Sequence, residues 1–256
     1  RPAPRLETWP LPATDFIVLV ILLLVGTFSL AAGAGFAARH LHVRGDAATL
    51  LQGAAAQFGL LAGIAAFRLQ VDRTRPFGLA FDREVVRAGA ATFLIALPPL
   101  MVTAKAAEFI LERCGLPTDR QDLVGLFARA DKGGLLTLMI GLAVILAPLT
   151  EELVFRAGLF RFARTRLPRA AALLLPAVFF ASLHVNWSTL VGLPSLAPLV
   201  VLAVIFSLAY ERTGRLGTAI VAHALFNLNT ILLILAGRSE EHTSELQSRL
   251  HLVCRL

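Results

Sequence analysis

Long apolar runs constrain the fold of this chain more than any other feature of its sequence. Most of them are long enough to cross a hydrocarbon core of roughly 30 Å as an α-helix. The sequence therefore predicts an all-α polytopic membrane protein, a bundle of about seven to eight transmembrane helices. The expected spans are residues 16–38, 49–67, 85–104, 135–160, 170–185, 196–210 and 218–236.

Composition supports the membrane assignment, because 57% of the residues are hydrophobic and only 16% are charged. The net charge of +7 could suggest nucleic acid, but the arginines fall in short loops between apolar runs, so no nucleic-acid partner is expected. The segment 156–169 has five arginines and no acidic residue, which predicts a loop on the cytoplasmic side of the cell (inner) membrane. The lipid bilayer is then the surrounding partner.

Four regions are expected along the chain. Residues 1–15 form a polar N-terminal segment, residues 16–134 hold the first transmembrane helices and their loops, and residues 135–237 form a helical core. Pro98 and Pro99 should kink the third span, with a short interfacial helix following at 106–114. Residues 238–256 break abruptly from the preceding apolar composition. Their sequence resembles the translation of a sequencing adapter, and we interpret them as an artefact of that origin.

Ionisable side chains inside expected spans are costly to insert and point to function. Glu151, Glu152 and Arg156 interrupt the fourth span. Glu152 and Arg156 are spaced i, i+4 with the acid first, which favours an ion pair on one helical face and a supporting structural role. Glu151 points about 100° away around the same helix, so it is free to face other helices.

Two further spans carry polar side chains at matching depth. His184 ends the fifth span, and His223 with Asn227 lies on the last one. At about 1.5 Å of rise per residue, Glu151, His184, Asn227 and His223 lie about 20, 22, 18 and 12 Å from the arginine-rich end. The i, i+4 spacing of His223 and Asn227 suits donation of two hydrogen bonds to an oxyanion. Each histidine taken alone could instead bond a neighbouring helix.

Three motifs in order resemble the CAAX-protease and bacteriocin-processing membrane proteases, which include the Ras-converting CAAX prenyl endopeptidase. They are EExxxR at Glu151, Glu152 and Arg156, FxxxH at Phe180 and His184, and HxxxN at His223 and Asn227. The resemblance covers residues 147–229. It implies an intramembrane endopeptidase in which Glu151 and His184 activate water, while His223 and Asn227 stabilise the oxyanion.

The sequence allows two mechanisms, one without a metal and one with zinc. The favoured mechanism uses the glutamate without a metal. One carboxylate and two imidazoles, from Glu151, His184 and His223, could instead bind zinc with a position open for water, although no HExxH signature is present.

Two other classes of function compete with a protease. A proton- or ion-coupled transporter could use the same buried groups as a relay, but no internal repeat is evident among the spans. A catalytically inactive membrane scaffold of the same fold is the third class. For a protease, the expected partner is a peptide or protein substrate, and prenylated or membrane-associated chains are compatible with the sequence.

Overall fold

The computed structural model describes residues 6, 9–71, 78–118 and 133–253. Within these residues the regular structure is helical, apart from one isolated bridge between Asn186 and Val191, which confirms the all-α prediction. The elements are α1 (Ala13–His40), α2 (Gly45–Gln70), α3 (Arg83–Arg113), α5 (Gly134–Gly141), η1 (Leu142–Leu146), α6 (Ala147–Glu152), η2 (Leu153–Phe160), α7 (Arg161–Ala163), α8 (Arg169–Ser182), η3 (Leu193–Ser195), α9 (Leu196–Thr213) and α10 (Leu216–Val253).

Each of the seven expected spans overlaps a helix, but the fifth helix ends at Ser182, so His184 lies in the turn beyond it and not within the span. Six helical stretches in the described part of the chain are long and apolar enough to cross a membrane, and one of these is the continuous rod from Gly134 to Ala163. The seventh, α8, has 14 residues, because Pro168 precedes its first turn and the chain turns away after Ser182. The chain is a multi-pass membrane protein.

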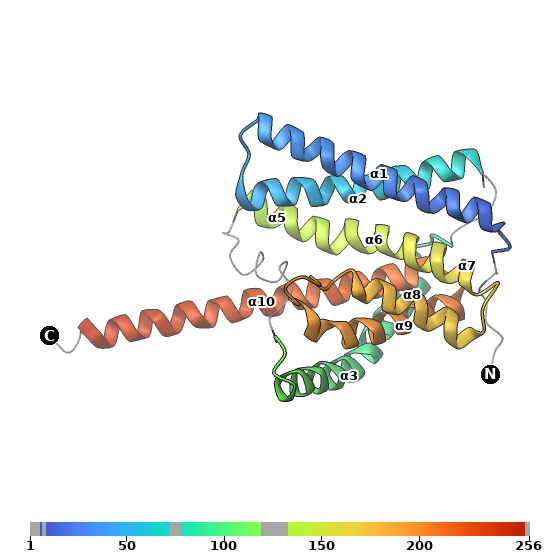
Figure 1. Cartoon of the computed structure of the whole chain (residues 1–256). Coiled ribbons are helices and arrows are strands. Elements are labelled where there is room, and N and C mark those ends of the chain that lie inside the picture. Colours follow the sequence, from blue (N-terminus) through green and yellow to red (C-terminus); the bar gives the residue numbers. More distant parts are fainter. Residues whose placement is uncertain (1–5, 7–8, 72–77, 119–132, 254–256) are drawn as a thin grey trace.

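Glycines join α1 and α2 into a tight hairpin. A Cβ added to Gly59 would lie 2.3 Å from the carbonyl oxygen of Gly26, and one added to Gly63 would lie 2.6 Å from that of Leu22. Small residues let membrane helices approach this closely, and van der Waals contact then holds them together. The hairpin lies along one side of the rod formed by α5 to α7 (Figure 1).

The rod contains two π-helical segments, η1 and η2, on either side of the short helix α6. Helix α10 packs against η1 and α6, on the side of the rod away from the α1–α2 hairpin (Figure 1). Leu153, Ala157 and Phe160 of the rod form a buried core with Tyr210 of α9 and Ile220 of α10. Such π-helical turns are rare and occur frequently at functional sites.

Two predicted boundaries were wrong. The arginine-rich segment 156–169 is not one loop, because the rod continues to Ala163 and Arg156 lies buried inside the bundle, 1% exposed, in an ion pair. The turn itself covers only residues 164–168. Residues 106–113 do not form a separate interfacial helix but continue α3, which accommodates Pro98 and Pro99 in its interior.

The C-terminal residues attributed to an adapter extend α10 to Val253, away from the other helices (Figure 1). Their origin stays a prediction.

Candidate active site

An ion pair predicted from helical spacing lies at the centre of the bundle. Nη1 of Arg156 is 3.0 Å from Oε1 of Glu152, and both side chains are shielded from solvent, at 1% and 0% exposed. The pair joins the last residue of α6 to η2, so it is formed within the rod. Its opposite charges offset part of the large cost of burying either one alone.

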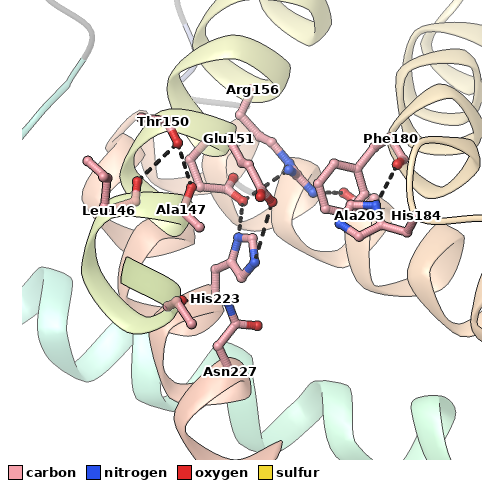
Figure 2. Close-up of polar contacts among 12 residues, drawn as sticks. Leu146, Ala147, Thr150, Glu151, Arg156, Phe180, His184, Ala203, His223 and Asn227 are labelled. Carbon is pink, nitrogen blue, oxygen red and sulfur yellow. Dashed lines mark hydrogen bonds and ion pairs between the residues drawn. The ribbon is translucent and has the colours of Figure 1, made fainter. Parts of the chain in front are cut away.

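Aromatic rings enclose the guanidinium of Arg156. Its Cζ lies 4.9 Å from the ring centre of Phe180 on α8 and 5.5 Å from that of Phe206 on α9. Its Nη2 donates to the carbonyl oxygen of Ala203 at 3.4 Å. The cation therefore connects the rod to α8 and α9, and Figure 2 shows it between Glu151 and Phe180.

His223 brings α10 onto the two glutamates. Its Nδ1 donates to Oε1 of Glu152 at 2.8 Å, and its Nε2 lies 3.7 Å from Oε2 of Glu151. The hydrogen bond at one ring nitrogen fixes the orientation of the other. Glu151 and Glu152 thus occupy opposite edges of one imidazole. Glu151 was expected to face the helices carrying His184 and His223, and of these two residues the described contacts join it only to His223 (Figure 2).

The two glutamates differ in access. Glu152 is fully shielded, and its Oε2 has no hydrogen-bond partner among the described residues. The side chain of Glu151 is 19% exposed and makes no ion pair with Arg156. Of the two carboxylates, Glu151 is the more accessible to solvent.

His184 lies apart from this cluster. Its Nδ1 donates to the carbonyl oxygen of Phe180 at 2.9 Å, and its ring centre lies 4.7 Å from that of Phe180 (Figure 2). In the described part of the chain, no hydrogen bond or ion pair joins it to Glu151. Phe180 connects His184 to the cluster, because its ring also contacts that of His223, with the two ring centres 6.3 Å apart.

Asn227 lies one turn beyond His223 on α10. Its Nδ2 donates to the carbonyl oxygen of Ala143 in η1 at 2.8 Å. The expected i, i+4 arrangement with His223 is present, and in this conformation the amide donor ties α10 to the π-helical segment.

Sequence reasoning missed three residues beside the cluster. Phe206 is fully buried, and its ring centre lies 5.4 Å from that of His223. Thr150, also fully buried, donates from its hydroxyl to Oε1 of Gln57 on α2. Gln57 could have been noticed as a lone amide in the apolar run GAAAQFGLL, but nothing in the sequence identifies its partner.

The positions of Glu151, His184 and His223 decide whether these residues could hold a zinc ion. A tetrahedral zinc site needs ligand atoms about 2 Å from one ion, so its three protein ligands must converge. Within the described ranges, no three His, Cys, Asp or Glu side chains gather in this way. Glu151, His184 and His223 therefore do not fit a zinc ion in this arrangement, and we derive no step through a metal.

A bundle of membrane helices with a carboxylate–imidazole cluster among them defines a polytopic membrane protein with an intramembrane polar site. Residues 133–229 match the family of the type II CAAX prenyl endopeptidase Rce1-like proteins, so this segment is similar to proteins of the CAAX protease family. The matched segment includes all three motifs, and it confirms the family resemblance that they suggested. No curated protein and no solved structure matches the chain.

Proposed function

We propose that this protein is an intramembrane endopeptidase whose general base is Glu151. One observation carries the proposal: the Glu151 carboxylate is partly accessible and lies 3.7 Å from Nε2 of His223, within the segment that matches an endopeptidase family. A partly desolvated carboxylate beside an imidazole is suited to proton transfer.

The reaction is hydrolysis of a peptide bond by water. Glu151 removes a proton from the water, whose oxygen attacks the carbonyl carbon and forms a tetrahedral oxyanion. Collapse of this intermediate breaks the C–N bond, and the proton held by Glu151 passes to the departing amine. General base catalysis of this kind contributes typically 10²- to 10⁴-fold to a rate.

The surrounding residues would stabilise the oxyanion and orient the water. The donors proposed for the oxyanion are the amide of Asn227 and Nε2 of His223. For this, the amide of Asn227 must exchange the carbonyl of Ala143 for the substrate. Because Nδ1 of His223 already donates to Glu152, Nε2 donates in the form of the ring that carries a proton on both nitrogens. His184, held at Nδ1 by Phe180, keeps Nε2 for the water. The pair of Glu152 and Arg156 holds the helices and the His223 ring in place.

The family name supports a peptide or protein substrate, and we propose a prenylated or otherwise membrane-associated chain. We place the enzyme in the cell (inner) membrane with the turn at residues 164–168 on the cytoplasmic side. Arg164, Arg166 and Arg169 lie in or beside that turn and support this orientation.

The test is cleavage of a farnesylated peptide ending in a CAAX sequence by the purified protein in detergent. Glu151→Gln keeps the shape of the side chain and removes the base, so cleavage should disappear. Glu112→Gln, at an exposed position on α3, is the matched control and should cleave like wild type.

Activity that survives a chelator and is lost in Glu151→Gln supports the proposal. Loss of activity with the chelator would contradict the metal-free mechanism, and full activity of Glu151→Gln would exclude Glu151 as the base.

A further inference from the structure

Gln57 lies outside the family match and still contacts the helix that carries both glutamates. It occupies α2 within an apolar stretch, where an amide side chain is costly unless it finds a partner. The partner is Thr150, whose hydroxyl is completely buried and donates to Oε1 of Gln57. This bond joins residues 93 positions apart and connects the α1–α2 hairpin to the rod.

Helix α6 needs such a contact because of what surrounds it. It has six residues, and a π-helical segment lies on each side, so the direction of its side chains differs from that in an unbroken α-helix. Contacts from neighbouring helices can then adjust the direction in which its side chains point.

Two of these contacts act on opposite faces of α6. Thr150 and Glu152 are two residues apart, which places their side chains about 200° apart around the helix. His223 and Arg156 contact Glu152 on one face, and Gln57 contacts Thr150 on the other. Glu151 lies between them in sequence, so both contacts together determine where its carboxylate points.

We propose that Gln57 is a positioning residue that sets the rotation of α6 and thereby places Glu151 against His223. The assignment rests on the proposed function, because it acts through the base of that reaction. The α1–α2 hairpin, which lies outside residues 133–229, would then help to position the general base.

The hydroxyl of Thr150 has alternative hydrogen-bond acceptors within the rod, which makes the test informative. It lies 3.0 Å from the carbonyl oxygens of Leu146 and Ala147, so it can donate there when Gln57 is removed. Gln57→Leu therefore leaves no orphaned hydroxyl, and the variant should fold.

The experiment measures kcat and KM on the farnesylated peptide for Gln57→Leu, Thr150→Val and the double variant. Because small displacements of a reacting group cost rate, each single variant should lose about tenfold in kcat with little change in KM. The double variant should lose no more than either single one. Thr150→Ser, which restores the hydroxyl, should recover most of the rate.

Gln52→Leu is the matched control, because Gln52 is exposed on the same helix and its amide donates to Ala48 in that helix. It should keep wild-type kcat, and its thermal midpoint in detergent should equal that of Gln57→Leu. Wild-type kcat in Gln57→Leu, or additive losses in the double variant, would overturn the assignment while the proposed function stands. Absence of Glu151-dependent cleavage by wild type would overturn both.

Discussion

The imidazole of His223 donates from Nδ1 to Oε1 of Glu152 at 2.8 Å, so the final helix is tied to a carboxylate that solvent does not reach. The same oxygen lies 3.0 Å from Arg156. Glu152 thereby joins the structural ion pair to the imidazole beside Glu151. Oε1 of Glu152 therefore contacts both the structural cation, Arg156, and the imidazole that lies beside the proposed base.

Glu152→Gln should lower kcat because the neutral amide holds the His223 ring less firmly and leaves Arg156 without its counter-charge. A misplaced reacting group costs on the order of 10²-fold, which is the size of loss we expect. Kinetics on the farnesylated peptide measure it. A variant with wild-type kcat would show that the bond between Glu152 and His223 does not matter for the reaction.

Arg156→Met should destabilise the protein strongly, since it leaves the buried Glu152 carboxylate without its cation. Breaking a buried pair costs about 3–5 kcal/mol, whereas removing both charges costs much less. Thermal unfolding in detergent should therefore rank Arg156→Met below the double variant Arg156→Met/Glu152→Met. Arg212→Met, at an exposed position at the end of α9, is the control and should unfold like wild type. The reverse ranking would contradict the pairing.

Phe206→Leu should reduce both stability and rate, because this ring contacts Arg156 and His223 together. Loss of the cation–π contact and of buried volume should cost about 1–2 kcal/mol. Phe28→Leu removes the same atoms from a ring that is 68% exposed on α1, and it serves as the control. Equal effects of the two substitutions in thermal unfolding would indicate that Phe206 only fills space.

Asp82 should make stability depend on pH at the end of the bundle that carries Arg215. The backbone N–H of Val85 at 2.9 Å, together with Arg215 at 2.5 Å, holds the pKa of Asp82 below its ordinary value. A lowered folded-state pKa stabilises the fold at pH values above the unfolded-state pKa. That contribution disappears as the pH falls through the folded-state pKa.

Asn at position 82 can still cap α3 but does not titrate. The difference in thermal midpoint between wild type and Asp82→Asn should therefore be largest near neutral pH and shrink below about pH 4. A difference that stays constant with pH would contradict the role of the charge.

The sequence by itself determined the helices and identified Glu151, Glu152, Arg156 and His223 as ionisable residues within them. Hydrophobic runs are local features, so all seven spans could be located, and i, i+4 spacing is enough to pair Glu152 with Arg156. The motifs suggested the family resemblance that the match over residues 133–229 supports, and helical rise predicted similar depths for Glu151 and the two histidines.

Only the tertiary structure decided which side chains meet. Local periodicity does not reveal that Nδ1 of His223 bonds Glu152 while its other edge faces Glu151, or that Phe180 lies between His184 and this pair. It does not place Gln57 against Thr150 either. These contacts join residues far apart in sequence, and they depend on how α2, α8, α9 and α10 rotate and pack around a rod whose π-helical turns change its register.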